Sequence, residues 1–574
     1  MRSLDPAGSW TRYVPAIAVG SVLAWLVALP LALVVLSSFR PGGFPLDPGY
    51  TLANYAVAYG DPAFPTLLRS TAVFALGSAT VALVLGAGLA WLIERTDLAG
   101  RDMLRGLVLI PMATPPILLA VAWAMLASPR NGVLNQALMG ALGLGQAPID
   151  IYTMPGMVLV QGLAMVPTAY LILSPAFASM DPSLEEAGTM AGAGTWLLVR
   201  HVMLPILWPQ LLSAAIFLLI VSLVVLDIPA ALGTPARVFV LSTQIYHLVS
   251  SSPTGMPQYG QVSALAMLFL AALMALAYAY YRLTRHAHRY RTVTGKGFRP
   301  RIFPLGRGKP WAMGAVVLYF LLAVVAPLLI LAWMSLMPYQ TGVSWAALRL
   351  VTFENHIEFL ANPRVLKAAT NSLVIALVSA TGVALLALIV SWLVVRLGVP
   401  GARLIDTLAF VPIAVPGVMI AVAVIYVYIA ASSVLPLYGT IWIIAIAYLT
   451  QYLPFGTRTM GGMMLQLHPD LEEAGATSGA GRFSVLMRVT LPLVWPAIAA
   501  VWIWVLAHAL RELSTALLLQ GRDNVVVPTL LWDTWSGGEP NRTAAGGLWL
   551  TLLLILMLVV WHMLARRAGI ERVR

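Results

Sequence analysis

Apolar segments long enough to cross a membrane recur along the whole chain, and they form two sets of six. A helix needs about 20 mostly apolar residues to cross the hydrocarbon core of a bilayer. The sequence therefore predicts an all-α, polytopic membrane protein with about 12 transmembrane helices. Prolines within 111–116 and 412–416 predict a bend in the third span of each set. The expected spans are 14–37, 71–93, 106–127, 153–176, 209–227 and 261–283, then 311–336, 371–395, 406–431, 440–457, 497–517 and 545–565.

The composition excludes several classes of protein. Of the 574 residues, 60% are hydrophobic and 10% are charged. A soluble domain carries about 25% charged residues, so a water-soluble enzyme is excluded, as are disordered and fibrous proteins. The chain has no cysteine, which excludes disulfides, thiolate metal sites and cysteine nucleophiles.

A basic stretch separates the two sets of spans. From Arg282 to Lys309 the chain holds nine Lys or Arg, two His and no acid. Basic loops stay on the cytoplasmic side of a membrane, so we expect this linker and both chain termini in the cytoplasm. The net charge of +12 then reflects this bias and not a nucleic-acid site. The apolar run 14–37 is too long for the core of a signal peptide and is expected to remain as the first span.

The two halves are sequence repeats. A shift of 287 residues places Leu184–Pro209 on Leu471–Pro496 without a gap, and 13 of the 26 positions are identical. Repeats with an even number of spans share one orientation in the membrane. A shift of 301 aligns the upstream residues, so the first half carries about 14 extra residues, which we expect in the 128–150 loop. The upstream pairs are Trp91 with Trp392, Arg95 with Arg396, Pro111 with Pro412 and Pro115 with Pro416.

The repeated block predicts a short polar helix in each half. Ser183 and Asp470 are suited to cap such a helix, with Glu186 and Glu473 three residues later. A Gly-Ala-Gly triplet then favours a left-handed turn. A helix too polar to insert and too small to fold alone is expected to dock on a partner, and its occurrence at matched positions favours this over a simple re-entry helix.

At this point the sequence resembles a known family. Glu-Glu-Ala-Gly, Gly-Ala-Gly and Leu-Pro, present in both halves, are similar to the EAA loop of permease subunits of binding-protein-dependent ABC importers. The family signature is Glu-Ala-Ala, and this chain departs from it slightly, because the second position of the signature is Glu. With two such loops, the chain resembles a fused permease in which one polypeptide replaces two subunits. The resemblance implies the type I importer fold, with two parallel six-helix repeats in the bacterial inner membrane.

The resemblance also implies partners and coupling residues. Each EAA helix would sit in a groove of one of two cytoplasmic ABC ATPase copies, and a periplasmic solute-binding protein would deliver the cargo. The chain would be a transport subunit and not an enzyme; it would hold no cofactor, because ATP and Mg bind the ATPase. The chain indeed lacks a phosphate-binding Gly-x-x-x-x-Gly-Lys-Ser/Thr motif. The implied coupling residues are Glu185, Glu186, Ala187, Gly188 and Gly194, with Glu472, Glu473, Ala474, Gly475 and Gly481.

The expected division of the chain follows these landmarks. It runs 1–65 (first span and periplasmic loop), 66–283 (first type-1 permease domain), 284–310 (basic cytoplasmic linker), 311–365 (span 7 and periplasmic loop), 366–567 (second type-1 permease domain) and 568–574 (cytoplasmic tail).

Three ionisable residues are candidates for the translocation path. Asp227 and Glu512 occupy matching places near the outer end of the fifth span of each half, and His508 lies one helical turn before Glu512. Acids near a membrane core are costly and are candidates for function. Oxygen ligands of this kind suit a hard cation. The alternative is that both acids simply end their helices at the outer interface, with Arg511 offsetting Glu512.

The cargo itself is suggested by the resemblance alone. The segments around Asp227 and Glu512 are most similar to those of ferric-iron importers, and relatives carry 2-aminoethylphosphonate, thiamine or polyamines. A secondary transporter with parallel repeats stays open as another class. Such a transporter would be expected to carry ion-coupling acids in mid-span, and it would have no reason to repeat a docking helix. No metal site and no catalytic cluster is predicted.

Overall fold

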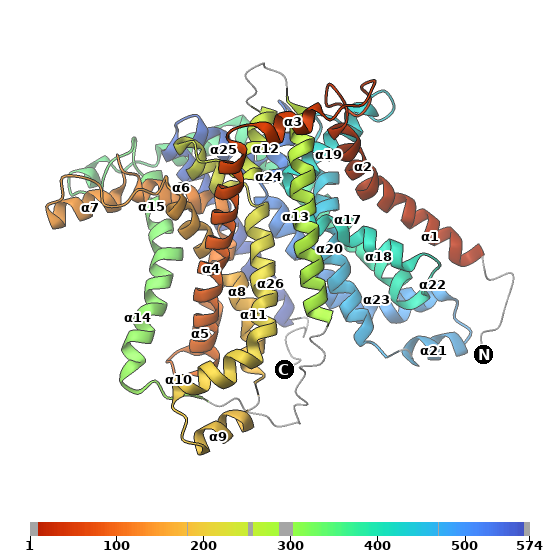
Figure 1. The fold of residues 1–574 in the computed structure, drawn as a ribbon, viewed down its shortest axis with the longest axis horizontal. Helices are drawn as coiled ribbons and strands as arrows, with labels where there is room; N and C mark the ends of the chain where they lie inside the picture. The colour runs from red at the N-terminus through yellow and green to blue at the C-terminus, as the bar shows by residue number, and fades with distance from the viewer. Residues whose placement is uncertain (1–9, 181, 251–256, 286–301, 469, 568–574) are drawn as a thin grey trace.

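The computed structural model describes residues 10–180, 182–250, 257–285, 302–468 and 470–567. Most of the basic linker and both chain ends, on which the predicted cytoplasmic positions depend, lie outside these residues. All named elements in the described part are helices (Figure 1). The first repeat comprises α1 (Trp10–Leu23), α2 (Leu29–Ser38), α3 (Ala53–Gly60), α4 (Phe64–Arg95), α5 (Arg101–Leu107), α6 (Pro116–Ala127), α7 (Val133–Leu142), α8 (Met154–Ala178), α9 (Pro182–Met190), α10 (Thr195–Leu198), α11 (Leu204–Val224), α12 (Leu241–Ser250) and α13 (Tyr259–Arg285).

The second repeat has the same order of elements with two differences: no counterpart of α7 occurs, and α24 stands where the first repeat has a π-helical turn, Pro229–Gly233. It comprises α14 (Lys309–Phe320), α15 (Ala326–Ser335), α16 (Glu354–Ala361), α17 (Pro363–Ser391), α18 (Ala402–Phe410), α19 (Gly417–Ala430), α20 (Ile441–Gln466), α21 (Asp470–Thr477), α22 (Arg482–Val485), α23 (Leu491–Arg511), α24 (Ser514–Leu519), α25 (Val527–Ser536) and α26 (Pro540–Arg567). The insertion expected at 128–150 is thus the segment that contains α7.

Eight helices in the described part are long and apolar enough to cross a membrane, or ten if each of two bent helix pairs counts as one span. All ten overlap predicted spans, although Trp196–Val224 and Phe483–Arg511 begin 13 and 14 residues before the predicted starts at 209 and 497. The remaining two predictions, 440–457 and 545–565, coincide with α20 and α26. These helices have 26 and 28 residues, which correspond to about 39 and 42 Å at 1.5 Å per residue. They are long enough to cross but are not among the ten apolar segments, and α20 carries the polar residues Gln451 and Arg458.

The bends predicted from proline are present in both repeats. In the first repeat, the helical segments Arg101–Ala113 and Pro116–Ala127 meet at a bend of 90°. In the second repeat, Ala402–Ala414 and Gly417–Ala430 meet at a bend of 117°. Thr114 and Val415 at the breaks have extended backbones, as expected for a residue that precedes proline. The bends deliver α6 and α19 to the centre of the molecule, where nearly all of their side chains are buried.

The first helices of the two repeats are exchanged across the molecule. The segment α1–α2 packs on α18 and α19 of the second repeat, and α15 packs on α6 of the first. Trp25 Nε1 donates to Tyr428 Oη at 3.1 Å, and Thr450 Oγ1 donates to the Leu26 carbonyl at 3.3 Å. The first helices of each repeat therefore pack on the other repeat. In this arrangement α9 and α21 lie at the same end of the bundle (Figure 1).

Candidate functional site

The predicted docking helices are the short helices α9 and α21. Each ends in a left-handed turn at the first glycine of its Gly-Ala-Gly triplet, because Gly192 and Gly479 both have φ of +83°. The turn is closed by the amide of Ala193, which donates to the Gly188 carbonyl at 3.0 Å; the equivalent bond of Ala480 measures 3.1 Å. The predicted turn is confirmed. The helices begin at Pro182 and Asp470, so the proposed capping residue Ser183 is already inside the first turn.

Each docking helix packs tightly against the helix that follows it. A Cβ on Gly188 would lie 2.5 Å from Leu198 Cδ2, and one on Gly475 would lie 3.1 Å from Val485 Cγ2. The absent side chain lets the two helices approach closely. Each repeat therefore presents a compact helical hairpin: α9 with α10, and α21 with α22. Gly194 and Gly481, also predicted as coupling residues, are exposed and have open space around them.

The two consecutive glutamates of each helix have different surroundings. Glu185 is buried and forms an ion pair with Arg95, whose side chain is buried as well. Glu472 forms an ion pair with Arg396 at 3.2 Å and accepts a hydrogen bond from Thr490 at 2.8 Å. In contrast, Glu186 and Glu473 are exposed, together with Ala187 and Ala474. One glutamate thus anchors the helix to the bundle, and the next faces outward.

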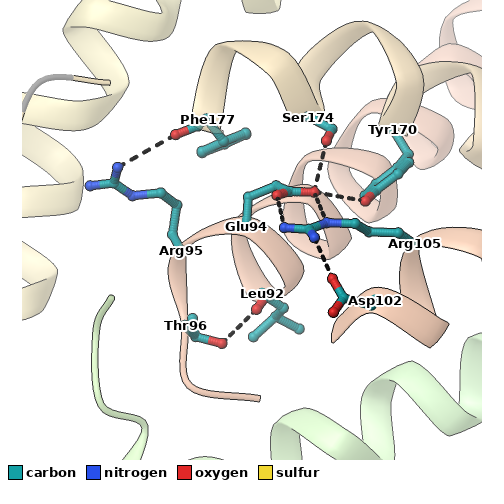
Figure 2. Close-up of polar contacts among 9 residues, drawn as sticks. All are labelled: Leu92, Glu94, Arg95, Thr96, Asp102, Arg105, Tyr170, Ser174 and Phe177. Carbon is teal, nitrogen blue, oxygen red and sulfur yellow. Dashed lines mark hydrogen bonds and ion pairs between the residues drawn. The ribbon is translucent and has the colours of Figure 1, made fainter. Parts of the chain in front are cut away.

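The arginine of each pair also holds the end of a second span. Arg95 donates to the carbonyl of Phe177 near the end of α8 at 3.5 Å (Figure 2). Arg396 donates to the carbonyls of Met464 and Leu467 at 2.8 and 2.9 Å. In both repeats, one arginine therefore joins the end of a long span, the end of the helix that precedes the docking helix, and the docking helix itself. Sequence reasoning aligned Arg95 with Arg396 but gave them no role; their recurrence before a docking helix was the available signal.

The first repeat has an additional buried network beside this junction. Glu94, which is 5% exposed, accepts hydrogen bonds from Arg105 at 2.7 and 3.1 Å and from Tyr170 and Ser174 at 2.9 Å each (Figure 2). At the 301-residue shift, Val395 takes the place of Glu94. The first docking helix is thus attached to a more extensively bonded region than the second.

The described end of the linker is fastened to the same junction. Phe303 donates to the Arg95 carbonyl at 2.7 Å and accepts from the Asp97 amide at 3.2 Å. The amide of Leu305 donates to Asp97 Oδ1 at 2.9 Å, and Lys309 lies 3.3 Å from Oδ2. These interactions, the Leu305 bond first, lower the pKa of Asp97 below its ordinary value of 3.8.

The three candidate path residues do come together with Arg511, but not as a metal centre. Asp227 is 8% exposed and interacts electrostatically with Glu512 and Arg511. Glu512 lies next to Tyr452, whose hydroxyl donates to Oε2 at 3.3 Å. The His508 ring faces the Trp504 carbonyl and Arg511. Within the described residues, no group of three or more His, Asp or Glu could hold a metal ion.

Comparison with known proteins identifies the family. The family "Binding-protein-dependent transport system inner membrane component" matches residues 82–288 and again 384–570. The chain belongs to this family. The permease is 24% identical over 481 residues to the ferric transport system permease FbpB of Actinobacillus pleuropneumoniae, covering 82% of the chain and 67% of that protein. It is 30% identical over 263 residues to the sulfate permease CysW of Escherichia coli, covering 44% of the chain and 82% of CysW.

Among solved structures, part of the chain is similar to a bacterial ABC transporter involved in the import of alginate, with a TM-score of 0.38 and 17% identity over 46% of this chain and 97% of that one. The permease is a multi-pass inner-membrane component of a binding-protein-dependent importer, and its family works with an ATPase and a periplasmic binding protein. The duplication seen in the sequence is the duplication of this family's domain. The coupling role of the ten residues in α9, α21 and their turns stays a prediction.

Proposed function

We propose that the permease forms the translocation path of an ATP-driven ferric-iron importer, and that two copies of one ATPase grip α9 and α21. The observation that carries the proposal is the duplicated hairpin with one anchored and one exposed glutamate. Two equivalent hairpins at one end of the bundle favour two equivalent partners. ATP and Mg would bind the ATPase copies, and the hairpins would transmit their movement.

Exposed apolar side chains support a protein partner for these hairpins. Met190 at the end of α9 is 89% exposed, Trp196 in α10 is 72% exposed, and Phe483 in α22 is 68% exposed. Large apolar side chains that flank an acidic helix are typical of the centre of a protein interface. The proposal therefore assigns Glu186 and Glu473, with these apolar side chains, to the contact with the ATPase.

The anchoring ion pairs provide a route from the ATPase to the membrane. When two ATPase copies close on ATP, α9 and α21 would move together. Arg95 and Arg396 connect these helices to the ends of α4 and α17, which are among the longest spans. A displacement of the hairpins would thereby move the spans that surround the path. The proposal places α9, α21 and both chain termini in the cytoplasm, as the basic linker predicts.

Iron(III) is favoured as the cargo by two considerations. Relatives that match most of the chain are named as ferric permeases. In addition, Asp227 and Glu512 supply carboxylate oxygens, which hard cations prefer. Importers for 2-aminoethylphosphonate, thiamine or polyamines use the same machinery and are outcomes of the test.

The test is uptake into proteoliposomes that contain the permease, its ATPase and its binding protein. We expect vanadate-sensitive accumulation of radioactive iron(III), and two ATPase copies for each permease after co-purification. Iron uptake that is lost when unlabelled thiamine, a polyamine or 2-aminoethylphosphonate competes would reassign the cargo. Uptake that persists without the ATPase would instead indicate a secondary transporter.

A further inference from the structure

One oxygen of a buried carboxylate in the membrane region lacks a hydrogen-bond donor. Asp227 follows α11 and is 8% exposed, and its Oδ1 has no hydrogen-bond partner among the described residues. Glu512 ends α23 in the other repeat, and the two acids repel each other. A buried oxygen without a donor and a like charge nearby are both unfavourable, so the pair is stabilised either by a proton or by a positive charge nearby.

Arg511 supplies this positive charge, although its hydrogen bonds go elsewhere. The guanidinium attracts both Asp227 and Glu512 electrostatically. Nη1 donates to the carbonyl of Met112, which lies in the broken span of the first repeat, between α5 and α6. Nη2 bonds His508 Nε2 at 2.9 Å. One side chain of the second repeat therefore compensates the acids of both repeats and also ties the repeats together.

His508 holds the guanidinium in this position. Arginine only donates, so His508 Nε2 is the acceptor and carries no proton. Nδ1 faces the Trp504 carbonyl at 2.8 Å and must therefore carry the proton. The ring is also stacked on Trp504 with centroids 3.7 Å apart, which fixes its plane. His508 is thus a neutral positioning residue and does not contribute a third ligand to the acids.

The arrangement occurs in one repeat only. Asp227 and Glu512 are 285 residues apart, and at this spacing Leu226 takes the place of Arg511. Leu226 is completely buried. The first repeat thus has an apolar side chain at this position, and the positive charge near both carboxylates comes from Arg511.

We infer that Arg511 is the counter-ion of Asp227 and Glu512 in the translocation path. We also infer that its bond to Met112 keeps the two repeats together and the path closed. The inference rests on the proposed transport of a cation. In the conformation described, the guanidinium neutralises Asp227 and Glu512 while its bond to Met112 holds the repeats together. When the repeats separate and this bond breaks, the guanidinium withdraws and the cargo cation is stabilised by the two carboxylates. An empty path therefore attracts no other cation.

The test uses terbium(III), a hard trivalent cation whose luminescence is sensitised by nearby tryptophans, with the full-length permease in lipid nanodiscs. We expect Arg511→Met to bind terbium at least about tenfold more tightly than the wild type, since a charged interaction of ordinary strength has been removed. Adding Asp227→Asn and Glu512→Gln to Arg511→Met should abolish the gain. Arg403→Met, which removes an exposed arginine from α18, is the matched control and should bind as the wild type does.

Equal terbium affinity in Arg511→Met and the wild type would overturn the inference, as would a gain that survives in the triple variant. If Arg511→Met does not fold, the counter-ion role requires the triple variant to recover, because it leaves no uncompensated carboxylate; failure of both variants contradicts the role. Uptake of iron by the wild type is a separate measurement. A permease that moves another cargo but gives the expected terbium results would refute the iron assignment and leave the role of Arg511 intact.

Discussion

Arg95 and Glu185, 90 residues apart in the chain, form an ion pair in which neither side chain is exposed to solvent. Its counterpart, Arg396 with Glu472, is partly exposed, at 10% and 23%. Both pairs connect a docking helix to the end of a long span. The same kind of ion pair thus occurs in both repeats; it is completely buried in the first repeat and partly exposed to solvent in the second.

The difference in burial predicts a difference in stability. Glu185→Gln leaves the Arg95 charge buried without its carboxylate, which costs about 3–5 kcal/mol. Glu472→Gln affects a partly exposed pair and is expected to cost less, about 1–3 kcal/mol. Thermal unfolding of the two variants in nanodiscs measures the contrast. Equal losses would contradict the assignment of the buried anchor to the first repeat.

The left-handed turns predict a strict preference for glycine at two positions. Gly192→Val and Gly479→Val force a branched residue to adopt φ of +83°, at a cost of about 1–2 kcal/mol each. Limited proteolysis of the hairpins should become faster in these variants. The matched controls are Gly194→Ala and Gly481→Ala, which have open space and ordinary backbone angles, and should be cleaved as slowly as the wild type.

The contact between α4 and α8 predicts another matched pair. A Cβ on Gly86 would lie 2.4 Å from Ala169 Cβ, whereas one on Gly88 would meet nothing within 4 Å. Gly86→Ala should therefore push the two spans apart and cost about 1–3 kcal/mol, as overpacking does. Gly88→Ala should not lower the unfolding temperature and should raise it slightly, because alanine favours a helix over glycine. A loss that is the same at both positions would show that the helix, and not the contact, is affected.

The attachment of the linker is expected to depend on pH. The pKa of Asp97 is lowered by its bonds to Leu305 and Lys309, so these bonds stabilise the folded state above the ordinary value of 3.8. The stabilisation is lost as the pH falls through the lowered pKa. The protection of the Leu305 amide against hydrogen exchange, relative to the intrinsic rate at the same pH, should fall on acidification below about pH 4. In Asp97→Asn the exchange should be fast at neutral pH and show no such step; an unchanged pH profile would contradict the assignment.

Much of the architecture follows from the sequence, because its signals are local. Apolar length located the spans, proline located the two bends, and the glycine triplets located the left-handed turns. The repeats were visible because an identical block occurs at a constant shift of 287 residues. The number of spans is harder to predict from apolar length alone. The helix α20 is long enough to cross a membrane, but it carries polar residues, which a helix buried in the bundle tolerates.

The sequence could not distinguish the roles of adjacent residues. Glu185 and Glu186 are identical in type, and only their rotation of about 100° around α9 makes one buried and the other exposed. The partner of Glu185 is distant in the chain, so no spacing rule identifies it. Likewise, the sequence places Arg511 beside Glu512, but it does not show that Arg511 also interacts with Asp227 and bonds the Met112 carbonyl, both in the first repeat.

The central claim is that α9 and α21 couple ATP hydrolysis to transport through their exposed glutamates. The most direct measurement is uptake by the double variant Glu186→Lys with Glu473→Lys, together with ATPase activity and the amount of permease in the membrane. Glu354→Lys reverses an exposed charge on α16, away from the hairpins, and serves as the control. The account predicts that uptake falls to background while ATPase activity and membrane amount are retained, because the charge reversal acts only at the docking surface. Uptake at the wild-type rate in the double variant would contradict it.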